Sequence, residues 1–226
     1  MPFGIPCGNI GGMAELSLRE RKRQRTRQAI VEAAVELFEE HGYEGTTVAD
    51  IAEAAEIGTR TFFSYFASKE EVLFPESDSR IRAVVDAIAA RGPEDRPADV
   101  LLRALRTVNR DSDDMVSRVA ALRMRLIRTV PAMRGRGLQL QLDAQREIAR
   151  HLCAAYPGEL DEVGAAALVG AFVGAVTGAL QVLMETGGDD PVAMSRRLQE
   201  ATDAALRPWL HEQDKPYVRS REQAPS

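Results

Sequence analysis

Three consecutive side chains, Thr59, Arg60 and Thr61, have the chemistry that reads the edges of DNA bases. An arginine can donate two hydrogen bonds to a guanine edge, and a threonine offers a hydroxyl and a methyl group to neighbouring bases. Arg60 could equally be a solvated surface residue, so its place in the fold decides between the two interpretations. We expect all three residues to contact bases if they open a helix that lies in a groove.

Positive charge gathers upstream of these residues, in the segment 17–27. The segment holds one acid, Glu20, against six bases: Arg19, Arg21, Lys22, Arg23, Arg25 and Arg27. Such a run is often only a solvated face or a tail. It can also follow a phosphate backbone or enter a minor groove. The side chains whose spacing predicts phosphate contacts are Thr46, Thr47, Tyr65, Lys69, Arg25 and Arg27.

Two helices are predicted upstream of Arg60 to position it. An apolar stripe predicts a helix that begins near residue 17 or 19 and ends at His41, with Gly42 as a left-handed cap. Thr47 and Asp50 fit a capping box, which predicts a short helix over 48–55.

Residues 59–66 are predicted as the next helix, and a further helix is expected to start at Ala67, with Ser68 as its N-cap and Glu71 at the capping-box position. Two short helices joined by a tight turn, and braced by a longer helix, form a helix-turn-helix unit. In such a unit Thr59, Arg60 and Thr61 occupy the first turn of the helix that reads the major groove.

Four stretches carry a resemblance to a known family: AAVELFEEHGY at 33–43, TTV at 46–48, IA at 51–52 and RTFFSYFASKE at 60–70. With them, residues 27–74 resemble the DNA-binding domain of TetR-family regulators. The resemblance implies an all-helical homodimer with an N-terminal domain that binds a palindromic operator. It also implies a C-terminal domain that accepts a small effector, which weakens DNA binding. The expected function is therefore a homodimeric transcriptional regulator that acts as a repressor.

Three residues depart from the usual pattern of that family. Glu56 stands where the turn commonly has glycine, so the turn either avoids a positive φ or holds a glutamate there at some cost. Gly58 replaces the usual Ser or Thr cap, which glycine can tolerably do. Phe63 replaces a tyrosine that commonly donates to a phosphate, so that contact is lost or passes to Tyr65.

Apolar periodicity predicts six more helices in the rest of the chain, separated by Gly and Pro breaks. Their expected ranges are 76–90, 98–109, 113–129, 132–154, 161–186 and 191–210. The resulting domain organisation is a flexible leader over 1–16, a helix-turn-helix domain over 17–74, a ligand-binding and dimerisation domain over 75–211, and a disordered tail over 212–226.

Residues 163–184 form an uncharged run of 22 residues, long enough to span a membrane. A membrane-associated helical protein is therefore an open alternative. The run also carries glycines every four residues, which suit a helix buried against a partner subunit in a four-helix bundle. No aromatic belt or basic loop flanks it, so we favour the dimer and expect no membrane contact. The predicted interface residues are Gly170, Gly174, Gly178, Leu198, Ala201 and Trp209.

A ligand pocket is predicted from polar residues that lie on or beside apolar helix faces. The expected lining residues are Arg123, Gln141, Gln145, Phe172 and Thr177. An inward Arg123 would suit an anionic group, although a snorkelling or salt-bridged arginine fits the same pattern. The Arg-Thr-Phe-Phe sequence at 60–63 also resembles that of a subgroup thought to recognise acyl-CoA-like ligands.

Composition excludes several classes of protein. The chain has 226 residues, a net charge of −5 and only 5% aromatic residues, and its abundant Ala and Leu favour an all-α fold over an all-β one. Cys7 and Cys153 are too few for a disulfide framework or a zinc site, which suits the cytoplasm. No phosphate loop, nucleophile elbow or metal-ligand spacing is present, and His151 does not share a helix face with Cys153. We therefore expect no catalysis, metal or cofactor, and an enzyme is the least favoured alternative.

Overall fold

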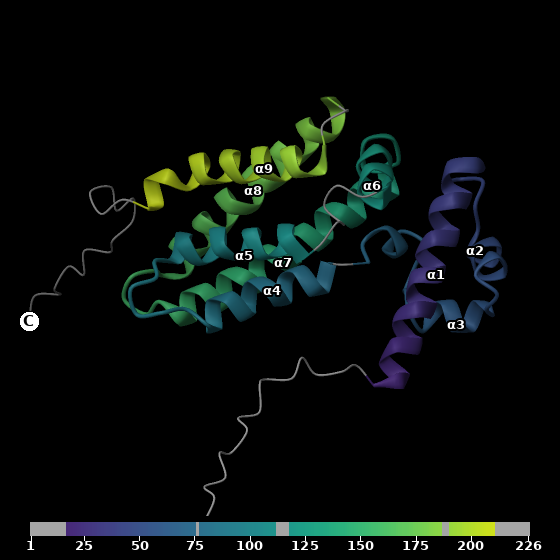
Figure 1. Ribbon diagram of the computed structural model, residues 1–226, viewed down its shortest axis with the longest axis horizontal. Coiled ribbons are helices and arrows are strands. Elements are labelled where there is room, and N and C mark those ends of the chain that lie inside the picture. The colour runs from purple at the N-terminus through teal and green to yellow at the C-terminus, as the bar shows by residue number, and fades with distance from the viewer. Residues whose placement is uncertain (1–16, 76, 112–117, 187–189, 211–226) are drawn as a thin grey trace, which may run out of the picture. The chain divides into compact units, whose positions relative to one another are not determined.

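The computed structural model of the chain describes residues 17–75, 77–111, 118–186 and 190–210. All regular secondary structure in these ranges is helical, which confirms the all-α class expected from the sequence. Figure 1 shows the elements in chain order: α1 (Leu18–Glu40), α2 (Val48–Ala54), α3 (Thr59–Phe63), η1 (Glu71–Leu73, a 3-10 helix), α4 (Ser77–Ala89), α5 (Pro97–Asp111), α6 (Arg118–Thr129), α7 (Pro131–Ala155), α8 (Glu162–Thr186), α9 (Pro191–Leu206) and η3 (Arg207–Trp209, also 3-10).

The chain divides into two compact units between Lys69 and Glu70. The expected boundary lay after residue 74, whereas this division makes η1 the first element of the second unit. The expected leader and tail lie outside the described residues. The roles of the two units in binding DNA and binding a ligand stay predictions at this point.

The core of the first unit forms where one face of α1 meets the side chains of the two short helices. Ile30, Ala34 and Phe38 recur every four residues along α1, and each is at most 2% exposed. Ile51 of α2 and Phe62 of α3 are completely buried. Fully burying a large apolar side chain stabilises a fold by about 1.5–3 kcal/mol. The core of this small unit therefore fixes the backbone that carries its surface residues.

Capping residues visible in the sequence set the ends of α1 and the start of α2. The Ser17 hydroxyl accepts a hydrogen bond from the Glu20 amide at 3.2 Å, and a Glu20 carboxylate oxygen accepts one from the Ser17 amide at 2.9 Å. These bonds hold the pKa of Glu20 below its usual range. Beyond α1, Gly42 takes a left-handed φ of 75°, as predicted. The expected capping box of Thr47 and Asp50 is also confirmed.

Helix α3 is shorter than predicted, since it ends at Phe63 rather than at Phe66. The Ser64 hydroxyl donates to the Thr61 carbonyl at 2.6 Å, a local bond that competes with helix continuation. The amides of Tyr65 and Phe66 both donate to the Phe62 carbonyl, so the chain tightens into a turn.

The helix expected to start at Ala67 with Ser68 as its cap is wrong. The chain forms turns there, followed by the three-residue η1, whose N-cap is Glu70 and which has no side-chain capping bond. Pro75 disfavours helical backbone at the preceding residue and lacks an amide donor, so no regular helix can develop across it. The segment is instead anchored by its apolar side chains, because Val72 and Leu73 are completely buried.

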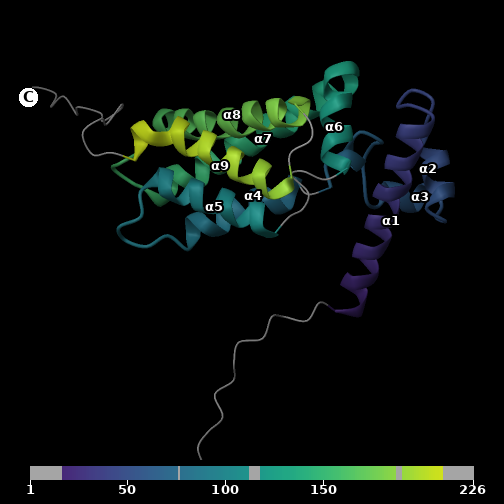
Figure 2. The ribbon, with the colours of Figure 1, turned by 45° about the horizontal axis from the view of Figure 1, so that its top comes forward.

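In the second unit, α8 packs along both α7 and α9 (Figure 2). Leu168, Val169 and Phe172 of α8 join Leu101 of α5 and Leu152 of α7 in the main core. The six helices predicted here agree with α4 to α9 within a few residues, apart from residues 113–117, which lie outside the described part of the chain. The last one ends at Leu206 rather than at residue 210, because Pro208 cannot continue an α-helix and the chain closes in η3.

Candidate nucleic-acid interface

The first turn of α3 presents its polar side chains to solvent. Thr59, Arg60 and Thr61 are exposed, whereas the next residue, Phe62, is completely buried. The Phe62 ring lies 5.9 Å from the Phe66 ring, centroid to centroid. This packing fixes the buried side of the short helix. The three polar residues therefore lie on an exposed surface of defined position, which a DNA groove could approach.

The turn before α3 carries backbone strain at Glu56. Its φ of 55° lies in the left-handed region, so the turn keeps a positive φ without the glycine that would adopt it freely. For an ordinary residue this conformation costs roughly 1–2 kcal/mol. The glutamate side chain is exposed, and it adds a negative charge directly before the helix that carries Arg60.

We expect Glu56→Gly to raise the free energy of unfolding by about 1 kcal/mol, because it removes this strain. Urea unfolding of the full chain, followed by its helical circular dichroism, measures the change. Glu53→Gly is the matched control, because it removes an exposed acid from inside α2 and should lower stability by about 1 kcal/mol. Equal destabilisation by both glycines would contradict a strained Glu56.

Thr47 is an exposed candidate for phosphate contact, but it already has a partner. Its hydroxyl lies 2.8 Å from a carboxylate oxygen of Asp50, and its amide donates to the same oxygen at 2.7 Å. Hydrogen bonds from this amide and from the hydroxyl keep the pKa of Asp50 below its usual range. Thr47 therefore sets the start of α2 and remains accessible beside it.

Thr46 does not fit the predicted contact to phosphate. Its side chain is 1% exposed, and its hydroxyl donates to the carbonyls of Gly42 and Leu37 at 2.9 and 3.2 Å. The hydroxyl thus joins the end of α1 to the start of α2. Because a buried polar group needs these bonds, we correct the expected role of Thr46 to a structural one.

Lys69 also makes contacts that sequence spacing did not reveal. Its ammonium group donates to the carbonyls of Tyr43 and Thr46 at 2.9 and 3.1 Å, and it lies 4.0 Å from the centre of the Tyr43 ring. Two of its three donors therefore hold the connection between α1 and α2. Lys69 positions this connection, and only its remaining donor is left for a phosphate.

The basic residues of α1 fall into different environments. Arg27 donates to the Tyr65 carbonyl at 3.2 Å, and its guanidinium lies 4.3 Å from the centre of the Phe66 ring. Arg27 thereby ties α1 to the turn that follows α3. The guanidinium of Arg23, which was not among the predicted phosphate contacts, lies 5.4 Å from the centre of the half-buried Tyr65 ring. Arg25 is exposed.

The five residues of the predicted ligand pocket occupy dissimilar sites. Arg123 is only 4% exposed, and it donates to the Leu73 carbonyl of η1 at 3.0 Å. Phe172 belongs to the main core, where it is 5% exposed. The other three, Gln141, Gln145 and Thr177, are half-buried. Of the two orientations of Arg123 that the sequence left open, the structure has the buried one, in which the guanidinium donates to a backbone carbonyl.

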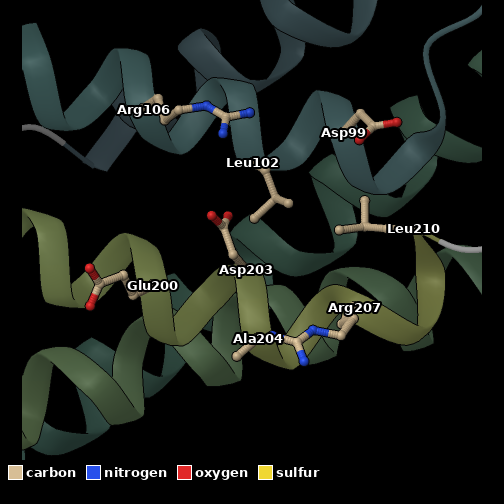
Figure 3. Close-up of a pocket in the computed structure, with 8 residues that line it drawn as sticks. All are labelled: Asp99, Leu102, Arg106, Glu200, Asp203, Ala204, Arg207 and Leu210. Carbon is tan, nitrogen blue, oxygen red and sulfur yellow. The ribbon is translucent and has the colours of Figure 1, made fainter.

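Two hollows of the second unit lie away from these five residues. One, of about 490 Å³, opens to solvent between α5 and α9, and Figure 3 shows Leu102 and Asp203 pointing into it. The other, of about 270 Å³, lies between α6 and α8 and is lined by Met124, Arg128 and Gln181 among others. Neither hollow contains a residue of the predicted pocket.

Within the described part of the chain, no other residue covers one face of α8. Gly174 and Gly178 are exposed, Gly170 is partly so, and a Cβ atom added to any of them would meet no atom within 4 Å. Val163 and Val182 are 64% and 53% exposed. This helix is long and apolar enough to cross a membrane, with a mean hydropathy of 2.0 over an 18-residue window of which 33% is buried.

The α9 residues of the predicted interface differ in exposure. Ala201 is exposed and Trp209, which follows α9 in η3, is half-buried against the main core. Leu198 is 2% exposed and packs with Leu180 and Leu183 of α8 in a second apolar cluster. We therefore correct the assignment of Leu198 from a subunit interface to the interior of its own chain.

Comparison with known proteins identifies what the chain resembles. The pattern that defines "Bacterial regulatory proteins, tetR family" matches residues 30–74. The transcriptional regulator TcmR of Streptomyces glaucescens is 37% identical over 150 residues, which cover 64% of this chain and 66% of TcmR. The repressor AcnR of Corynebacterium diphtheriae is 29% identical over 127 residues, covering 56% of this chain and 60% of AcnR. Each alignment thus leaves about a third or more of the relative unmatched.

A solved structure extends the likeness to both units. The TetR-family repressor FadR of Thermus thermophilus, crystallised with lauroyl-CoA, superimposes with a TM-score of 0.52 and 19% identity over 88% of this chain and 100% of FadR. At that identity the match shows a shared fold. The named relatives are transcriptional regulators and repressors, which favours DNA binding over the membrane and enzyme alternatives.

Proposed function

Because the chain belongs to the TetR family of bacterial transcriptional regulators, we propose that it acts in the cytoplasm as a homodimeric repressor released from its operator by a small acyl-type effector. The family consists of regulators rather than enzymes, and the helix-turn-helix unit is its DNA-binding element. The operator, the dimer, the repressor role and the effector are the parts of the proposal that go beyond family membership.

The observation that carries the DNA-binding role is the contrast between the first turn of α3 and the residue that follows it. Thr59, Arg60 and Thr61 are exposed beside the completely buried Phe62, so a groove can reach them without unfolding the unit. In this arrangement Arg60 reads a guanine and the two threonines contact neighbouring bases. Thr47 and Tyr65 lie on exposed or half-exposed flanks and contact phosphates.

The uncovered face of α8 supports the homodimer. Gly174 and Gly178 leave room for a second backbone, and exposed Val163 and Val182 gain from burial against a partner helix. Exposed Ala201 of α9 and partly exposed Trp209 contribute to the same four-helix interface. Two-fold symmetry would place two α3 helices in successive major grooves, about 34–36 Å apart.

The proposed effector acts through the second unit. FadR, which shares this fold, was crystallised with lauroyl-CoA, and the apolar helices here suit an acyl chain. Arg123 links α6 to the Leu73 carbonyl in η1, and η1 follows the DNA-binding unit directly in the chain. An effector that displaces α6 would therefore move the segment that leads out of the helix-turn-helix unit.

A mobility-shift experiment tests the proposal, with the DNA upstream of the protein's own gene as probe and a shuffled duplex of equal length as control. We expect binding to the upstream DNA at a protein concentration about 10³-fold lower than to the shuffled duplex. Lauroyl-CoA is the effector to be added first, and it should release the upstream probe. Equal affinity for both duplexes would reject the repressor, whereas specific binding that ignores lauroyl-CoA would reject only the acyl-type effector.

A further inference from the structure

The first turns of α1 extend beyond the core of the DNA-binding unit as a continuous helix. Residues 18–25 are all exposed, whereas burial on one face of α1 begins near Thr26 and is complete at Ile30. Figure 1 and Figure 2 show these turns continuing past α3. The basic run is therefore part of a regular helix fixed by the Ser17 and Glu20 capping box, so its side chains have defined directions.

Helical spacing places five of the six basic side chains of α1 in two opposite groups, and Lys22 lies between them. Arg19, Arg23 and Arg27 follow each other at intervals of four residues, so they lie on one face, which continues into the buried face of Ile30. Arg21 and Arg25 lie on the other side, because the mean direction of this pair is about 160° around the helix from the mean direction of Arg19 and Arg23.

Contacts within the unit fix which face is directed toward α3. The Arg27 guanidinium binds the Tyr65 carbonyl, and the Arg23 guanidinium lies over the Tyr65 ring. Tyr65 comes two residues after the end of α3, so the row that starts at Arg27 runs outward from the end of the reading helix. Arg19 and Arg23 are its exposed members.

We propose that Arg19 and Arg23 form a rigid phosphate-binding row, which extends the DNA contact of the unit beyond the bases read by α3. Four residues of helix separate them by about 6 Å, a length over which one DNA strand presents about two phosphates. The only acid among them, Glu20, has its carboxylate directed back to the Ser17 amide. This inference rests on the proposed DNA-binding function and moves the α1 phosphate contacts from Arg25 and Arg27 to Arg19 and Arg23.

Two double variants with the same change in charge test the row. Arg19→Ala with Arg23→Ala removes the proposed contacts, and Arg21→Ala with Arg25→Ala removes the same charge from the opposite face. Binding to the upstream DNA and to the shuffled duplex is measured by fluorescence anisotropy from about 50 to 200 mM salt, a range over which phosphate contacts change affinity strongly. Circular dichroism checks that both variants keep their helix content.

In the first variant, the slope of log affinity against log salt should become shallower by about 1.8 for each bound subunit. This value corresponds to about 0.9 for each of the two lost phosphate contacts. Both duplexes should weaken by the same factor, so their affinity ratio stays unchanged. The second variant should keep the wild-type slope. Equal slopes for the two variants, or an unchanged slope in the first, would overturn the row. Failure of the wild type to prefer the upstream DNA would instead count against the repressor, whatever the slopes show.

Discussion

Replacing Arg60 with alanine is expected to weaken binding to the proposed operator strongly while leaving the fold intact. Arg60 is exposed in the first turn of α3 and is not part of the core that positions this helix. A bidentate contact between arginine and guanine discriminates against other bases by about 1–3 kcal/mol. A dimer loses two such contacts, or about 2–6 kcal/mol, which corresponds to a fall in operator affinity of roughly 30-fold or more.

Arg60→Lys separates base reading from simple charge attraction. Lysine keeps the positive charge but lacks the planar fork that binds two acceptors of guanine. If Arg60 reads a base, the lysine variant keeps the salt dependence of the wild type and still loses most of its preference for the operator over shuffled DNA. Competition binding with the two duplexes measures both quantities. Full operator preference in the lysine variant would show that Arg60 contributes only charge.

The second large effect is expected from Gly174→Leu on the uncovered face of α8. A Cβ atom added at this position meets none of the described atoms of its own subunit within 4 Å, so we expect the subunit to fold with the larger side chain. In a dimer the two leucines would force the α8 helices apart, and overpacking costs about 1–3 kcal/mol for each. We expect the subunit dissociation constant to rise by roughly 30-fold or more. Sedimentation velocity over a dilution series measures it.

Gly135→Leu is the matched control for this variant. Gly135 lies in α7 and is exposed, and a Cβ atom added there also meets no described atom within 4 Å, so we expect the subunit to accept the same substitution. It lies outside the proposed interface and should leave the dissociation constant unchanged. If Gly174→Leu dimerises as tightly as Gly135→Leu, the interface is elsewhere and the glycine face has no part in assembly.

Local signals allowed much of the fold to be predicted. The Thr47 and Asp50 capping box and the glycine after α1 depend on residues at most three positions apart, and each behaves as predicted. The strained turn at Glu56 was one of two outcomes that the sequence left open, and the structure selects the positive φ. Apolar periodicity also placed α4 to α9 within a few residues, because each buries one face.

The roles of the polar residues were harder to predict, because their partners are distant in sequence. Lys69 binds carbonyls 23 and 26 positions earlier, and Arg123 binds one 50 positions earlier. Helical spacing left the direction of Arg123 open, and it could not reveal which group the side chain meets. The same reason explains Leu198, where an apolar stripe on α9 did not reveal whether α8 of the same chain or a partner would cover it.

The exposed apolar surface along α8 also makes the stability of this protein depend on its concentration. If a second copy is what shields that surface, the association equilibrium contributes to the conformational stability of every subunit, and dilution weakens both together. Newly made chains would pass through a vulnerable stage before they meet, during which sticky helices invite aggregation or proteolysis. In a cell with few copies, part of the protein would then be monomeric and could not bind both half-sites of an operator. The expression level of the protein would therefore affect the degree of repression.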